Sequence, residues 1–170
     1  MAESETRDVF IVGLRNAHAM ENQALSIMKP QLSRIENYPE VAEKLGHHIT
    51  ETEGQIRRIE EILAGLDEDH STLKDMALSI TGSMAALGHT VAGDEILKNS
   101  FANFAFENYE VAAYKSLLTV AEAGGFMAAV AGLKANLAEE EAMASWLDSQ
   151  VTLLTQKFLS LRVSGRTAKV

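Results

Sequence analysis

The chain has 170 residues, of which 46% are hydrophobic, so its length and composition predict one globular domain with a substantial core. A formal net charge of −9 argues against a general nucleic-acid binder, because such proteins present basic surface to phosphates. No cysteine is present, which excludes disulfides, thiol catalysis and thiolate-held metals. The sequence carries no signal-like segment and no apolar run near the roughly 20 residues of a membrane span, so we expect a cytoplasmic protein that binds no membrane.

Apolar residues recur at intervals of three and four along most of the chain, which is the helical period. This pattern predicts an all-α chain with four long helices, at about residues 6–36, 40–65, 94–123 and 126–161. Pro30 falls inside the first of these and predicts a kink. The last nine positions, 162–170, are rich in Arg and Lys and are expected to form a flexible, solvated basic tail.

The lengths of the connections predict how the four helices are arranged. The turns at 37–39 and 124–125 are short, so each should join two antiparallel helices into a hairpin. Residues 66–93 form a much longer connection with enough apolar residues for an extra helix. Two hairpins joined by one long crossover make a ferritin-like four-helix bundle, whereas an up-down-up-down bundle needs no such crossover.

Each predicted helix places an acid on its apolar stripe near mid-length. Glu21 continues the three-and-four spacing of the first helix, and Glu107 does so in the third, with Glu110 one turn further on. In the fourth helix the spacing selects Glu140, although a shift of one residue would select Glu139 instead. Acids on an inner face are informative because a buried carboxylate must be protonated, paired or bound to a metal.

The second predicted helix adds a nitrogen ligand, because His48 and Glu51 lie three residues apart on one face. Glutamates from several helices together with a histidine form the ligand set of carboxylate-bridged di-iron and di-manganese bundles. We therefore predict a dinuclear iron or manganese site with six candidate ligands: Glu21, His48, Glu51, Glu107, Glu110 and Glu140. Three aromatic residues of the third helix are expected to pack inside, the last of them as a candidate hydrogen-bond donor near the site: Phe101, Tyr109 and Tyr114.

Four strings of residues in these helices resemble the YciE/YciF family of ferritin-like bacterial stress proteins: Glu21–Gln23, His48–Gln55, Glu107–Tyr114 and Leu133–Glu140. The resemblance spans most of residues 8–150, in the same order and spacing. It implies a ferritin-like bundle with a dinuclear centre related to that of rubrerythrins, whose third helix carries a pair similar to Glu107 and Glu110. It also implies a role in the stress response.

The sequence departs from the wider ferritin-like pattern at two positions. That pattern places a histidine three residues after the ligand glutamate of the second and fourth helices, where this chain has Gly54 and Met143. The fourth predicted helix contains no histidine at all. A site this rich in carboxylates favours manganese, magnesium or ferric iron over zinc, and an empty site is the alternative.

Two classes of function are compatible with these residues. A metal-binding protein would support ferroxidase-like or peroxidase-like chemistry, although the sequence leaves open whether the chain is an enzyme. A non-catalytic stress or scaffold protein would instead keep its inner acids hydrogen-bonded to neighbouring side chains: Gln23, His48, Gln55 or Tyr109. In either case we expect a homodimer rather than an iron-storing cage, because no extra helix is predicted beyond residue 161.

Overall fold

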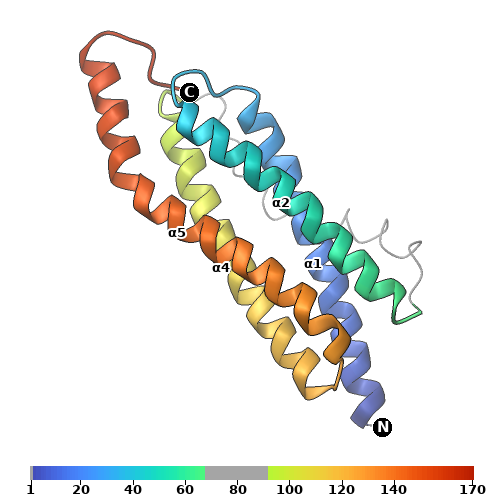
Figure 1. Cartoon of the computed structure of the whole chain (residues 1–170). Coiled ribbons are helices and arrows are strands. Elements are labelled where there is room, and N and C mark those ends of the chain that lie inside the picture. Colours follow the sequence, from blue (N-terminus) through green and yellow to red (C-terminus); the bar gives the residue numbers. More distant parts are fainter. Residues whose placement is uncertain (1, 68–91) are drawn as a thin grey trace.

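The computed structural model describes residues 2–67 and 92–170, and the regular structure in these ranges is helical. The four helices are α1 (Ala2–Leu32), α2 (Pro39–Ala64), α4 (Glu95–Ala123) and α5 (Met127–Val163), as Figure 1 shows. The all-α prediction is confirmed, with helix ends displaced by a few residues. The extra helix predicted within 66–93 falls on residues that lie almost entirely outside the described part of the chain.

The helices form two antiparallel hairpins, α1 with α2 and α4 with α5 (Figure 1). At one end of the bundle, Phe10 of α1 stacks on Phe126 between α4 and α5, with ring centroids 4.5 Å apart. At the same end, Arg7 donates a hydrogen bond to the carbonyl of Leu66, just past α2. α4 begins at the opposite end, so α2 and α4 run parallel and each helix packs mainly against two neighbours.

Proline and glycine mark the boundaries of the helices. Pro39 opens α2 at a position where a missing N–H costs nothing, and Pro30 lies in the last turn of α1. The turn between α4 and α5 depends on two glycines. Gly125 has a φ of 73°, and a Cβ on Gly124 would collide with the ring of Phe126.

The core lies between the four helices and follows the predicted stripes at most positions, with Leu14, Ile59 and Leu133 fully buried. Two predictions for α4 are wrong, because Phe101 is 49% exposed and Tyr109 is 64% exposed. The buried stripe of α4 includes the predicted Glu107 and Glu110 and three further polar residues that a count of apolar positions passes over: Asn99, Ser100 and Asn103.

Residues 162–167 are exposed, in keeping with the predicted solvated tail, but the last three residues pack against the bundle. Tyr38 donates a hydrogen bond of 2.7 Å to the carbonyl of Ala168, and the amide of Ile96 donates one of 2.9 Å to the carbonyl of Lys169. Ala168 is buried in a small apolar cluster with Tyr38 and Ile96. The final residues therefore pack across the end of the bundle through backbone carbonyls, which charge counting does not reveal.

Within the described ranges, no helix combines the length and the apolar character that crossing a bilayer requires.

Candidate metal centre

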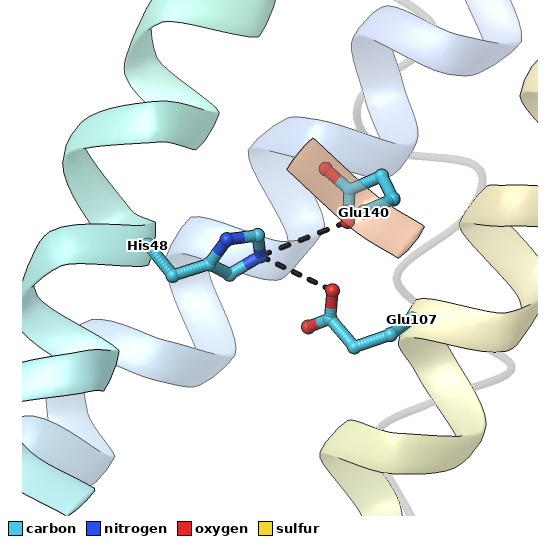
Figure 2. A group of neighbouring side chains, drawn as sticks. All are labelled: His48, Glu107 and Glu140. Atoms are coloured by element: carbon cyan, nitrogen blue, oxygen red, sulfur yellow. Dashed lines mark ion pairs between the residues drawn. The ribbon is translucent and has the colours of Figure 1, made fainter. Parts of the chain in front are cut away.

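Three side chains from three helices converge in the middle of the bundle: His48 of α2, Glu107 of α4 and Glu140 of α5 (Figure 2). One potential ligand atom of each lies within 4.8 Å of the others. The Nε2 atom of His48 is 3.2 Å from Oε2 of Glu107 and 3.7 Å from Oε2 of Glu140. All three residues are buried, so water does not compete strongly for these atoms.

Glu51 lies beside this group and contacts the far side of the imidazole. Its Oε2 atom is 3.0 Å from Nδ1 of His48, and its other oxygen is 3.3 Å from Nδ1 of the exposed His47. A carboxylate at Nδ1 favours a proton on that nitrogen and leaves Nε2 free to act as a ligand. The structure therefore places Glu51 where it orients His48, rather than in the group of three.

The two remaining predicted ligands, Glu21 and Glu110, are buried as well, with 0% and 1% of their surface exposed. Tyr114 donates a hydrogen bond to Oε1 of Glu21, as the sequence suggested for this tyrosine. Burial raises the pKa of Glu110 well above its ordinary value, and the charges of Glu21 and Glu140 raise it further, so these acids share one electrostatic environment. Glu21 and Glu110 are not part of the close group formed by His48, Glu107 and Glu140.

Several carboxylate oxygens in this region are buried without a hydrogen bond from the described residues. They are Oε2 of Glu21, Oε2 of Glu107, both oxygens of Glu110 and Oε2 of Glu140. An unsatisfied buried polar atom typically costs about 1–3 kcal/mol, more if it is charged. Divalent cations would satisfy these oxygens and offset their charge, so the residues present fit a metal centre.

The pKa values of Glu21 and Glu140 are raised by their burial close to other carboxylates. Burial raises the pKa of Glu140 to about 11, and the neighbouring carboxylates of Glu107 and Glu21 contribute to this rise. Burial also raises the pKa of Glu21 to about 8, although the hydrogen bond from Tyr114 opposes this shift. Burial lowers the pKa of His48, but the adjacent Glu107 and Glu51 outweigh it, so the net shift is upward. Without a metal, Glu140 and most of Glu21 are therefore protonated at neutral pH.

The structure also decides between the two neighbouring glutamates of α5. Glu140 points inward and accepts a hydrogen bond from Gln55, whereas Glu139 is paired near the surface with Arg58 at 2.6 Å. Sequence reasoning missed Asn136, which is fully buried beside Gln55 and Tyr114. Its position four residues before Glu140 places it on the same helical face, and that spacing is the signal that could have found it.

Comparison with known proteins places the chain in a family. The model of a domain of unknown function, DUF892, matches residues 5–160. Protein YciF of Escherichia coli (strain K12) is 30% identical over 143 residues, which cover 79% of this chain and 83% of that protein.

Two crystal structures agree with this assignment. A protein from Xanthomonas campestris pv. campestris superposes with a TM-score of 0.76 at 27% identity, over 92% of this chain and 98% of that one. The E. coli stress protein YciF superposes with a TM-score of 0.72 at 26% identity, over 86% and 94% of the two chains. The chain therefore belongs to the DUF892 family and is a homologue of the stress protein YciF.

Proposed function

We propose that this protein binds a dinuclear iron or manganese centre in the middle of its bundle. The observation that carries the proposal is the set of buried carboxylate oxygens that find no hydrogen-bond partner among the described residues, on three helices that surround Nε2 of His48. Acids kept for structure alone would be expected to face cations or hydrogen-bond donors with both oxygens. Within the described residues, both oxygens of the buried Glu110 lack a hydrogen bond, and the charges that act on its pKa are those of other acids.

The donor set favours particular metals. Four buried glutamates would contribute carboxylate oxygens, and His48 would contribute one imidazole nitrogen: Glu21, Glu107, Glu110 and Glu140. Carboxylate-rich sites suit iron and manganese better than zinc, which prefers nitrogen and sulfur ligands. A bound pair of such ions would supply Lewis-acid and one-electron redox chemistry. E. coli YciF is described as a stress protein, and we propose that this chain likewise acts in stress, by binding or oxidising ferrous iron or by removing peroxide.

Neighbouring residues prepare the ligands for this role. Gln55 engages Oε1 of Glu140 and leaves its Oε2 free, and Tyr114 does the same for Glu21. Glu51 holds Nδ1 of His48 and leaves Nε2 toward the centre. Each of these three ligands therefore keeps one donor atom available in a fixed direction, which lowers the entropic cost of metal binding.

Elemental analysis tests the proposal on chain purified without an affinity metal, after anaerobic loading with ferrous iron or with manganese. We expect about two ions per chain, as in other carboxylate bundles, and the loss of at least one ion in Glu140→Gln and in Glu110→Gln. Glu141→Gln is the matched control, since Glu141 is the next residue of α5 but pairs on the surface with Lys115 at 2.7 Å. Unchanged metal content in Glu140→Gln would contradict the proposal.

A second candidate is a non-catalytic stress or scaffold protein whose acids share protons instead of metals. The raised pKa values of Glu21 and Glu140 and their hydrogen bonds to Tyr114 and Gln55 favour this candidate. It predicts that wild-type protein takes up neither metal and melts at the same temperature with and without a chelator.

A further inference from the structure

A chain of hydrogen bonds leads from Glu21 to the surface of the bundle and uses one residue from each helix. Tyr114 of α4 donates to Oε1 of Glu21 on α1. Asn136 of α5 donates from Nδ2 to the hydroxyl of Tyr114 at 2.9 Å. Arg58 of α2 donates from Nη1 to Oδ1 of Asn136 at 2.5 Å. These contacts make the four helices members of one polar network.

Burial changes along this chain in one direction. Glu21, Tyr114 and Asn136 are 0% exposed, whereas the side chain of Arg58 is 30% exposed. Arg58 is anchored at its outer end by Glu139, whose two oxygens accept hydrogen bonds of 2.6 and 2.8 Å from the guanidinium. Arg58 also lines an open pocket at the end of the bundle, beside Ile62 and Gly132. The network therefore connects the solvent boundary with the buried acids.

The donors in the chain all point toward Glu21. A guanidinium only donates, so Asn136 presents its carbonyl oxygen to Arg58 and its amide nitrogen to Tyr114. The hydroxyl of Tyr114 accepts that bond and gives its single proton to Glu21. Hydrogen bonds aligned in this way polarise one another, and the positive charge of Arg58 terminates the series. Because the side-chain amide of Asn136 does not exchange its protons readily, this series of hydrogen bonds is suited to orienting a carboxylate rather than to conducting protons.

We propose that Arg58 is a positioning residue of the metal centre, which acts through Asn136 and Tyr114 to fix the carboxylate of Glu21 with Oε2 free for a metal. This inference rests on the proposed function, since it assigns Arg58 a role in metal binding. It predicts that Arg58 affects the metal affinity of the centre although it is not itself a proposed metal ligand. Its exposed neighbour Arg57 should have no such effect.

The test compares Arg58→Ala with Arg57→Ala, which removes the same charge one residue away. Manganese affinity is measured by competition with a metal-binding dye, and the EPR spectrum of the manganese-loaded protein is recorded. We expect Arg58→Ala to bind manganese roughly 10-fold more weakly, within the range for residues that orient metal ligands, and to change the spectrum. Arg57→Ala should match wild type in both measurements. Arg58→Lys keeps the charge and one donor, so it should recover most of the affinity.

A double variant shows whether the hydrogen bonds from Arg58 to Glu21 act as one unit. If Arg58 works through Tyr114, then Arg58→Ala combined with Tyr114→Phe should bind manganese no more weakly than Tyr114→Phe alone. Additive losses would overturn the inference, and so would wild-type affinity in Arg58→Ala. If wild-type protein binds manganese but Arg58→Ala is unaffected, only this inference fails. If wild type binds neither manganese nor iron, the proposed function fails and the inference falls with it.

Discussion

Two regions of the bundle bury a glutamate completely, and they treat it in opposite ways. At the end of the bundle, Glu95 is held by Arg34 at 2.7 Å and by Lys169 at 3.3 Å. Burial alone would raise the pKa of Glu95, but the two cations outweigh it and the pKa is lowered. In the middle of the bundle, Glu140 faces the acid Glu107, and its pKa is raised to about 11.

The difference separates an acid that the chain neutralises by itself from acids that lie crowded against one another. The charge of Glu95 is neutralised by the chain itself, so nothing further is required from outside. The buried acids around His48 raise one another's pKa, so they need protons or metal ions to be buried at low cost. Burial of a carboxylate does not by itself indicate a site, whereas burial beside other carboxylates does.

The largest expected effect is the pH dependence of metal affinity. Glu21, Glu110 and Glu140 have raised pKa values, so their protons must leave when a metal binds. The pKa of Glu140 is about 11, so its proton is displaced by the metal over the whole range from pH 6 to pH 8. One displaced proton contributes about tenfold per pH unit, so manganese should bind roughly 100-fold more tightly at pH 8 than at pH 6. Calorimetric titration in two buffers of different ionisation enthalpy counts the protons released. An affinity that is constant over this range would mean that the central acids are already ionised.

The second effect concerns the stability of the metal-free protein. Because the pKa of Glu21 is raised to about 8 on folding, its stabilising contribution is full below its ordinary pKa and is lost as pH rises through 8. We expect the free energy of unfolding to fall between pH 5 and pH 8 by about 1.4 kcal/mol per pH unit for each proton lost. Urea unfolding at several pH values measures this slope. Glu21→Gln should have a smaller slope, and bound metal should abolish it.

The smallest expected effect comes from the end of the bundle and has the opposite sign. Because the pKa of Glu95 is lowered on folding, its contribution is present above its ordinary pKa and is lost only as pH falls through the lowered value. Glu95→Gln should cost about 1–2 kcal/mol at pH 7, less than for a fully buried pair, since Arg34 and Lys169 remain partly hydrated. Thermal melting measures the loss.

Controls accompany this last prediction. Glu40→Gln removes an exposed ion pair with Lys157 and should change stability by less than about 0.5 kcal/mol. Metal content should be unchanged in Glu95→Gln, because this acid is neutralised within the chain. A loss of metal in Glu95→Gln would remove the distinction between the two regions.

The sequence by itself determined the helices and the faces that they bury. The helical period requires that residues three and four apart share a face, so Glu21, His48, Glu107 and Glu140 were predicted to point inward, and all of them are buried. Short connections likewise determined the two hairpins. These features depend on residues close together in the chain, and that is the range over which a periodic pattern carries information.

Only the tertiary structure decided which partners meet across helices. The spacing of residues along the chain offers no reason to pair Arg58 with Asn136, or to neutralise Glu95 with two distant cations. It also left Glu139 and Glu140 as alternatives, since one residue rotates a helix by about 100°. These choices depend on how neighbouring helices are rotated and displaced against one another, which follows from packing along the whole bundle rather than from any single helix.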